Sequence, residues 1–380
     1  MVSTRAIVSA SPALPRGLSL EGLEKRLYVA PLGSLSGLAA QAAVGSGQGW
    51  SLAGGSLAFS QCLVMLREDG RVYQSVAGFA DLIDWSEAEG PEVARHVGRL
   101  IKRIGAARPD YAGLSMDRPR IMGIVNVTPD SFSDGGSWFD ADKAVAHGLE
   151  LLAAGADILD VGGESTRPGS LPVPPDEEIR RVVPVIRALA ERGAVVSVDT
   201  RNAPVMAAAV EAGAAIINDI SALEGPDALS VAAKSGAAVM LMHMQGDPQT
   251  MQQEPVYDWA PLDVFDYLAG RVAACEAAGI ARDRICVDSG VGFGKTLAHN
   301  MEVMAHQALY HALGLPILLG VSRKSFIAKA SRGEAAQDRL AGSITAALAG
   351  LDRGVQMLRV HDVAETAQAV AIWRGLTSAQ

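Results

Sequence analysis

From residue 121 onward, short apolar segments alternate with longer amphipathic stretches that are rich in alanine. The apolar segments span residues 121–127, 157–161, 194–198, 215–217, 237–242, 284–287, 316–321 and 356–360. The amphipathic stretches span residues 141–154, 176–191, 203–212, 226–234, 261–279, 298–313, 334–352 and 362–374. Nearly continuous apolar segments are typical of parallel strands buried on both faces. Eight strand–helix units in about 260 residues predict a (β/α)₈ (TIM) barrel, with an open doubly wound sheet as the alternative.

The first 117 residues have a different pattern. Residues 31–56 are rich in Gly, Ser and Ala, and residues 57–66 form an apolar segment that predicts a strand. Asp69-Gly70 is a hairpin signal. A helix is expected from an N-cap at Ser86 to about Ile104, followed by a linker at residues 108–110. We therefore expect residues 1–117 to form a small α+β extension of unknown role, and residues 118–380 to form the catalytic barrel.

Composition and charge exclude several classes of protein. The chain of 380 residues is 49% hydrophobic and has a formal net charge of −9, which argues against a general binder of nucleic acid or membrane surfaces. No apolar segment reaches the length of a membrane span, and the N-terminus lacks the pattern of a signal peptide. The three cysteines form no CxxC motif, which favours a reducing compartment. A cytoplasmic enzyme acting on small molecules is the expectation.

Polar or charged residues occur where each predicted strand ends. They are Asn126, Asp160, Asp199, Asn218 with Asp219, His243, Asp288, Ser322 to Lys324, and Arg359 with His361. In a barrel the carboxyl ends of all strands meet at one mouth, where the active site lies. A helix cap explains one such residue, but not all eight positions.

These side chains are of two chemical kinds. Asp199, Asn218 and Asp288 offer acceptors and an amide that suit the amino and amide edges of a flat heterocycle. Lys324, Arg359 and His361 offer cations and donors that suit phosphate oxygens. The residue types therefore predict a substrate in which a heterocycle is joined to a phosphorylated group.

Two long segments resemble the signatures of dihydropteroate synthases. They are NVTPDSFSDGG at residues 126–136 and DVGGESTRPG at residues 160–169. Shorter matches follow in family order at residues 197–200, 217–220, 241–246, 292–295, 320–325 and 359–362. The resemblance covers the chain from about residue 120 to its end. The family condenses 6-hydroxymethyl-7,8-dihydropterin diphosphate with p-aminobenzoate, and gives 7,8-dihydropteroate and pyrophosphate.

The resemblance implies a role for each matching residue. The pterin would be held by Asp199, Asn218, Asp288 and Lys324. The diphosphate would be held by Asn126, Arg359 and His361, with Asn126 as a ligand of Mg²⁺. The p-aminobenzoate site would be lined by Thr166, Phe293 and Ser325. Loops that close over the substrates would contribute Phe132, Asp134 and Arg167. The catalytic set is Asp199, Lys324, Arg359 and His361. The resemblance also implies a homodimer, for which residues 340–351 are a candidate contact. It further implies sensitivity to sulfonamides.

Other interpretations stay open. A methyltetrahydrofolate methyltransferase shares the pterin set but has no need for the cations at Lys324, Arg359 and His361, and a non-catalytic paralogue would bind pterin without turnover. Position 289 is Ser where the family usually has Pro, which predicts a modest effect on pterin binding. Other polar residues have plausible structural roles. His243 would support the loop that follows it, and Asp160 and Glu164 would orient neighbouring side chains. Lys295 would point to solvent.

Overall fold

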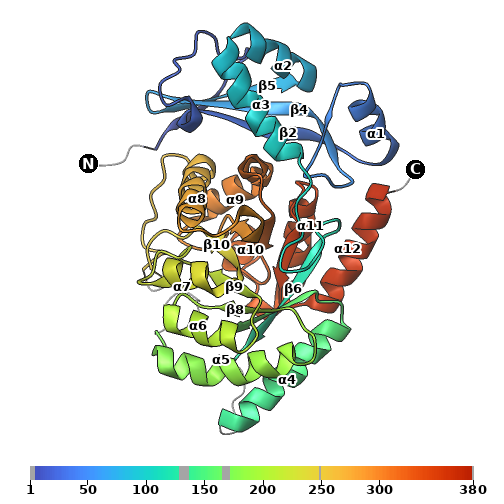
Figure 1. Cartoon of the computed structure of the whole chain (residues 1–380). Helices are drawn as coiled ribbons and strands as arrows, with labels where there is room; N and C mark the ends of the chain where they lie inside the picture. Colours follow the sequence, from blue (N-terminus) through green and yellow to red (C-terminus); the bar gives the residue numbers. More distant parts are fainter. Residues whose placement is uncertain (1–4, 128–136, 165–171, 248–249, 379–380) are drawn as a thin grey trace.

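The computed structural model describes residues 5–127, 137–164, 172–247 and 250–378, without the side chains of residues 137–140. Its largest unit is a closed parallel barrel in the order β10-β11-β12-β13-β6-β7-β8-β9 (Figure 1). The strands are β6 (Arg120–Asn126), β7 (Ile158–Gly162), β8 (Val196–Asp199), β9 (Ile216–Asp219), β10 (Ala238–Met242), β11 (Ile285–Asp288), β12 (Ile317–Gly320) and β13 (Met357–Val360). Since β13 pairs with β6, the sheet is closed, and the alternative of an open doubly wound sheet is wrong.

Helices surround the barrel as the amphipathic stretches predict. They are α4 (Ser137–Ala153), α5 (Pro175–Ala190), α6 (Ala203–Glu211), α7 (Ala228–Ser235), α8 (Ala260–Ala277), α9 (Leu297–Ala305), α10 (Ser325–Ala330), α11 (Leu340–Leu351) and α12 (Val363–Ser378). Short 3₁₀ segments are η3 (Arg282–Arg284), η4 (Gln307–Leu313) and η5 (Ala336–Asp338). The single helix expected at 298–313 is therefore divided into α9 and η4, and α11 begins later than expected.

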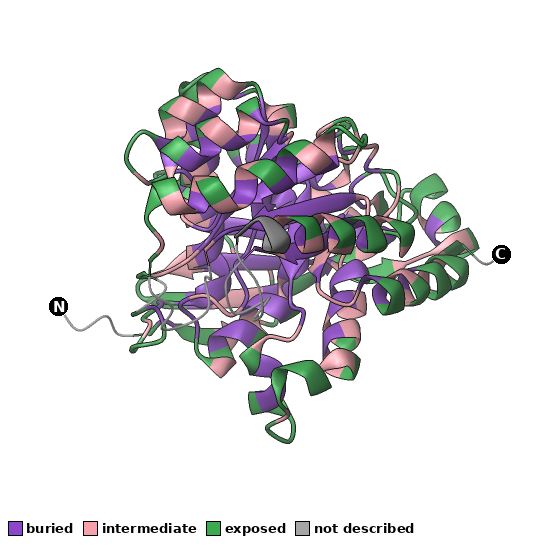
Figure 2. Cartoon of the chain, turned by 90° about the horizontal axis from the view of Figure 1, so that it is seen from below, coloured by how far each residue is buried: buried purple, intermediate pink, exposed green. Residues whose placement is uncertain are grey.

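The barrel interior is closed at the amino-terminal ends of its strands. Tyr111 is fully buried and packs with Met116 against inward-facing residues of the strands, among them Met122, Met240 and Met357. Viewed from below, the buried strands form the centre and the helices turn their exposed faces outward (Figure 2). The linker expected at residues 108–110 is thus part of the packed structure, since Arg108 is buried too.

The N-terminal region forms an α+β layer, as predicted. Its strands are β1 (Ile7–Ala10), β2 (Leu27–Leu35), β3 (Trp50–Ser51), β4 (Ala58–Glu68) and β5 (Arg71–Gly78), in the order β1-β5-β4-β2 with β3 beside β4. Its helical segments are η1 (Leu23–Lys25), α1 (Gly37–Gly45), α2 (Phe79–Ala88) and α3 (Pro91–Gly105). Asp69 and Gly70 both have positive φ, at 49° and 72°, which is the geometry of a two-residue hairpin turn.

The helix expected from Ser86 to Ile104 is two helices. Ser86 lies inside α2, is buried, and donates its hydroxyl to the carbonyl of Ile83, so it is not an N-cap. The chain turns at Gly90, whose φ is 109°, and Pro91 begins α3. Proline disfavours helical geometry in the residue before it and is well suited to the first turn of a helix. This Gly-Pro pair therefore separates α2 from α3.

The N-terminal sheet packs against one flank of the barrel, α2 and α3 lie beside the sheet, and α3 also reaches η4 of the barrel (Figure 1). The Tyr28 ring meets Phe265 of α8 edge-on at 5.6 Å, and its hydroxyl lies 2.9 Å from the Asp266 carboxylate. Arg67 of β4 donates to Asp263 and Asp266 at 2.7 Å each.

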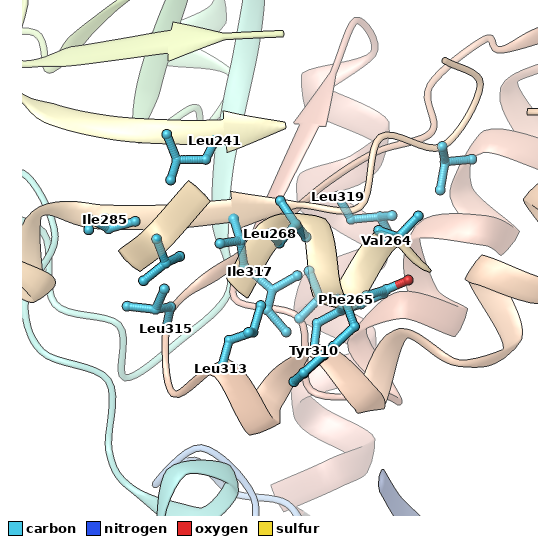
Figure 3. Close-up of a cluster of buried hydrophobic side chains, with 14 of the residues drawn as sticks. Leu241, Val264, Phe265, Leu268, Ile285, Tyr310, Leu313, Leu315, Ile317 and Leu319 are labelled. Carbon is cyan, nitrogen blue, oxygen red and sulfur yellow. The ribbon is translucent and has the colours of Figure 1, made fainter. Parts of the chain in front are cut away.

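Behind this contact, the buried side chains of α8 and η4 pack against β10, β11 and β12 (Figure 3). The residues drawn include Phe265 from α8 and Tyr310 and Leu313 from η4. The flank beneath the N-terminal sheet is therefore continuous with the core of the barrel.

Candidate active site

Three of the predicted strand-end residues meet around Asp160, which lies in the middle of β7 and is fully buried. Arg359 donates through Nε to the Oδ2 atom of Asp160 and through Nη2 to the Oδ2 atom of Asp199, each at 2.6 Å. Asn218 donates through Nδ2 to the same Asp160 oxygen at 3.1 Å. The structure thus brings Asp199, Asn218 and Arg359 together, and Asp160 joins them.

The electrostatics of this cluster are set by burial. Burial raises the pKa of Asp199 to about 7, and the carboxylates of Asp160 and Glu178 add to the rise while Arg359 opposes it. The Oδ1 atoms of Asp160 and Asp199 are buried and lack a hydrogen-bond partner among the described residues. Buried carboxylate acceptors that lack a partner among the described residues suit a ligand that brings N–H donors.

A second cluster forms around Lys324, directly after β12. Its Nζ atom donates to the carbonyl of Val291 and lies 4.6 Å from the centre of the Phe293 ring. Burial lowers the pKa of Lys324 to about 8, and the cation of Arg359 adds to the fall while Asp288 and Asp199 oppose it. Burial also raises the pKa of Asp288, whose Oδ1 atom accepts from the backbone N–H of Gly290 at 2.8 Å. A cation, a carboxylate and an aromatic face therefore lie side by side.

Lys295 holds the loop that carries Phe293, and the expectation that it points to solvent is wrong. It is 1% exposed, and its Nζ atom lies 2.8 Å from the Gly290 carbonyl, 3.1 Å from the Phe293 carbonyl and 2.9 Å from Nδ1 of His243. Burial lowers the pKa of both Lys295 and His243 well below their usual values. His243 thus has a structural role, but through Lys295 it supports the loop after β11 rather than the loop that follows His243 itself.

A glycine is required where this loop crosses the end of β10. Gly290 has a φ of 64°, and a Cβ atom there would lie 1.8 Å from the carbonyl oxygen of His243. Any side chain at this position would push apart the two strand ends that carry Asp288 and His243.

The remaining predicted residues lie around the same mouth. His361 follows β13, where its Nδ1 atom lies 3.0 Å from Oγ of Ser322. Asn126 is the last residue of β6, is half-buried, and lies beside Gly162 of β7. Ser325 is exposed at the first turn of α10, next to Lys324. Arg323 is directed elsewhere, since its Nε atom donates to Asp362 at 3.0 Å.

Sequence reasoning missed Glu178 of α5. This residue is fully buried and accepts from Nδ2 of Asn202 at 2.7 Å, beneath the turn that follows Asp199. Acidic residues are common in the first turn of a helix, so its position gave no sign of a role in the site. Glu164, which was expected to orient its neighbours, pairs with Arg201 at 3.2 Å.

Four predicted site residues, Phe132, Asp134, Thr166 and Arg167, lie outside the described residues. Within the described ranges, no group of three or more His, Cys, Asp or Glu side chains could hold a metal ion. No helix there has both the length and the apolar character to cross a membrane.

The barrel and its mouth are those of a pterin binding enzyme. The family model described as "Pterin binding enzyme" matches residues 122–361, from β6 to the end of the last strand. The N-terminal sheet lies outside the matched region.

Comparisons with individual proteins narrow the family further. Dihydropteroate synthase of Escherichia coli strain K12 is 46% identical over 268 residues, which are 70% of this chain and 95% of that protein. A Yersinia pestis dihydropteroate synthase in complex with a sulfonamide drug is 47% identical, with a TM-score of 0.67 over 70% of this chain and 97% of that one. The Xanthomonas albilineans enzyme in complex with 7,8-dihydropteroate is 43% identical, with a TM-score of 0.63 over 71% and 98%. The chain belongs to the dihydropteroate synthase family.

Proposed function

We propose that this chain condenses 6-hydroxymethyl-7,8-dihydropterin diphosphate with p-aminobenzoate, and forms 7,8-dihydropteroate and pyrophosphate. The observation that carries the proposal is the mouth of the barrel, where buried carboxylates with open acceptor atoms lie beside Arg359 and Lys324. A 43% identical relative binds 7,8-dihydropteroate, the product of this reaction.

The pterin is assigned to Asp199, Asn218, Asp288 and Lys324. The 2-amino group and the neighbouring ring nitrogen of a pterin form a pair of N–H donors, which a carboxylate accepts in parallel. Lys324, whose Nζ atom lies by the Val291 carbonyl and the Phe293 ring, would donate to an acceptor atom of the pterin ring.

The diphosphate is assigned to Arg359 and His361, with Asn126 at the same mouth. Arginine binds phosphate oxygens through two parallel hydrogen bonds. Asn126 would hold Mg²⁺, which takes few protein ligands and fills its other positions with phosphate oxygens and water. A single half-buried amide at the end of β6 fits that requirement. When bound, the ion supplies positive charge to the leaving diphosphate. Loss of turnover with a chelator, and its recovery with added Mg²⁺, tests this assignment.

The p-aminobenzoate is assigned to Phe293 and Ser325, together with Thr166. Phe293 is half-buried and lies next to the Lys324 cation, so its ring offers an apolar surface close to the reacting pterin. Phe132, Asp134 and Arg167 are assigned to loops that cover the bound substrates.

The chemical steps need no nucleophile from the protein. The bond between the pterin methylene carbon and the diphosphate oxygen breaks, and its electron pair leaves with pyrophosphate. Arg359 and His361 stabilise the negative charge that develops on this leaving group. The nitrogen of p-aminobenzoate then forms a bond to the methylene carbon and loses one proton. Exclusion of water matters because water would compete for the same carbon.

The two alternatives predict different outcomes. A methyltransferase would have no use for cations at Lys324, Arg359 and His361, all of which lie at this mouth. A non-catalytic paralogue would bind pterin without releasing pyrophosphate.

The test is pyrophosphate release by the purified chain with the pterin diphosphate and Mg²⁺, with and without p-aminobenzoate. Release that depends on p-aminobenzoate, yields dihydropteroate and is lost in Lys324→Ala supports the proposal. A folded chain that binds pterin but releases no pyrophosphate would overturn it.

A further inference from the structure

A buried polar pair lies directly behind the pterin site. Ser289 follows Asp288 at the end of β11 and is 1% exposed. Its Oγ atom accepts a hydrogen bond from Nε2 of Gln307 at 2.7 Å. Gln307 is the first residue of η4 and is fully buried. This is the position at which the family resemblance implies a proline instead of serine.

The pair bears on Asp288 because Ser289 is the next residue, whereas the hydrogen bonds from Lys295 and Lys324 hold the loop farther along, at Gly290, Val291 and Phe293. The carbonyl of Asp288 accepts from the backbone N–H of His243 at 3.0 Å, and its Oδ1 atom accepts from the N–H of Gly290. Proline fixes its own φ, whereas serine leaves that torsion free. The hydrogen bond from Gln307 restrains Ser289 from outside the barrel, and so restrains the carboxylate one residue before it.

The N-terminal region in turn holds η4. Both β2 and α3 pack against η4. Nη2 of Arg108 donates to Nδ1 of His311 at 3.1 Å, and both residues are buried. Arg103 of α3 packs closely against Gly314, where a Cβ atom would meet its side chain at 3.1 Å. On its other side, η4 packs through Tyr310 and Leu313 on the barrel strands (Figure 3).

We propose that Gln307 is a positioning residue for the pterin-binding carboxylate of Asp288, acting through Ser289, and that the N-terminal region (residues 1–117) supports this role by holding η4 in place. The inference rests on the proposed function, in which Asp288 holds the pterin. It gives the N-terminal region a part in substrate binding that acts through η4.

The direct test is a double-mutant cycle in the full-length chain with Ser289→Ala, Gln307→Leu and both together. A buried hydrogen bond contributes about 1 kcal/mol, so each single change is expected to raise KM for the pterin diphosphate by about 3- to 10-fold. The KM for p-aminobenzoate and kcat are expected to stay within about twofold. Both changes remove the same hydrogen bond. The KM for the pterin diphosphate in the double variant is therefore expected to be no higher than in the more impaired single variant.

Gln356→Leu is the matched control. Gln356 is also a buried glutamine at a strand end, but it binds the N–H of Ile317 and the carbonyl of Gly354 at the opposite end of the barrel. Its loss is expected to lower the thermal midpoint without changing the KM for the pterin diphosphate. If Ser289→Ala and Gln307→Leu behave like this control, the positioning role is wrong.

Rescue provides a second measurement. The variant with Ser289→Pro and Gln307→Leu replaces the polar pair by a fixed φ and an apolar side chain. Replacing both partners of a buried hydrogen bond by apolar groups is close to neutral. This variant is expected to return the KM for the pterin diphosphate to within about twofold of the parent chain, whereas Gln307→Leu alone does not. Equal KM values for the two folded variants would contradict the proposal.

The part assigned to the N-terminal region is tested by Arg108→Met. This change removes the donor to His311 but keeps the length of the side chain. We expect a rise of about 2- to 5-fold in the same KM, with no further rise when Gln307→Leu is added. A folded Arg108→Met chain with an unchanged KM would overturn this part. Failure of the proposed function is distinct, because the parent chain itself would then release no pyrophosphate.

Discussion

The guanidinium of Arg359 donates from Nη2 to the Oδ2 atom of Asp199 over 2.6 Å, across the mouth of the barrel. This bond joins the group assigned to the diphosphate with a group assigned to the pterin. The same guanidinium reaches Asp160, so the two halves of the substrate site share one ion-pair network. The protonation of Asp199 therefore influences both halves.

The first prediction concerns pH. Asp199, with its pKa raised by burial to about 7, must be ionised to accept from the pterin, so kcat/KM for the pterin diphosphate rises as pH increases through 7. Lys324, with its pKa lowered by burial to about 8, must be protonated to donate, so kcat/KM falls above pH 8. The expected profile of initial rates is a narrow bell.

Lys324→Arg separates the two limbs, since arginine stays protonated throughout the accessible range. Its residual activity is expected to keep the acid limb near pH 7 and to lose the alkaline limb. An alkaline limb that stays at pH 8 in this variant would assign the fall to another group.

The second prediction concerns Lys295. Lys295→Met keeps the length of the side chain but removes the partner of the Phe293 carbonyl and of Nδ1 of His243, whereas the Gly290 carbonyl keeps the N–H of Phe293. Each unpaired buried group costs about 1–3 kcal/mol. We expect a fall of about 2–4 kcal/mol in the free energy of unfolding, and a rise in the KM for p-aminobenzoate, because Phe293 loses its support.

Urea unfolding and steady-state kinetics measure these two effects. Lys329→Met is the control, because this lysine is exposed at the end of α10. Stability within about 0.5 kcal/mol of the parent in Lys295→Met would show that the loop is held by its other contacts.

The third prediction concerns the contact between the sheet and the barrel. Arg67→Ala removes the cation that pairs with both Asp263 and Asp266, and leaves two partly buried carboxylates facing each other. We expect a loss of about 1–3 kcal/mol in the free energy of unfolding. Arg95→Ala removes an exposed pair with Glu92 on α3 and is expected to change stability by less than about 0.5 kcal/mol. Equal losses in the two variants would mean that the Arg67 pair adds nothing to docking.

The fourth prediction concerns inhibitors. A sulfonamide resembles p-aminobenzoate in shape and charge, and a 47% identical relative binds a sulfonamide drug. Inhibition of this chain is expected to be competitive with p-aminobenzoate and to weaken in Phe293→Ala. Undiminished turnover at low p-aminobenzoate and saturating sulfonamide would refute the assignment of this site.

Much of this architecture could be predicted from the sequence because barrels place the ends of their strands together. The apolar segments predicted eight strands, and the polar residues that follow them, such as Asp199 and Arg359, do meet at one mouth. Strand ends are marked by an abrupt change from apolar to polar residues, which a single sequence displays clearly.

The remaining features depend on contacts between residues distant in sequence. Lys295 was expected in solvent because lysine is rarely fully buried, and nothing in the sequence shows that backbone carbonyls converge on it. Glu178 occupies an ordinary helix N-terminus, and its burial follows only from how α5 packs on the barrel. The break between α2 and α3 was the exception, since Gly90-Pro91 signals it locally.

Tyr111 and Met116 fill the barrel at the amino ends of its strands, so small molecules have no passage through that end. The proposed substrates and products would therefore pass at the carboxyl ends of the strands, where Asp199 and Arg359 meet. A pterin bound at Asp199 and Asn218 would lie deepest in the barrel. A molecule bound between it and the carboxyl ends of the strands would block its release. Under the proposed function, the closed floor predicts an ordered sequence in which the pterin diphosphate binds before p-aminobenzoate, and product-inhibition kinetics would test that order.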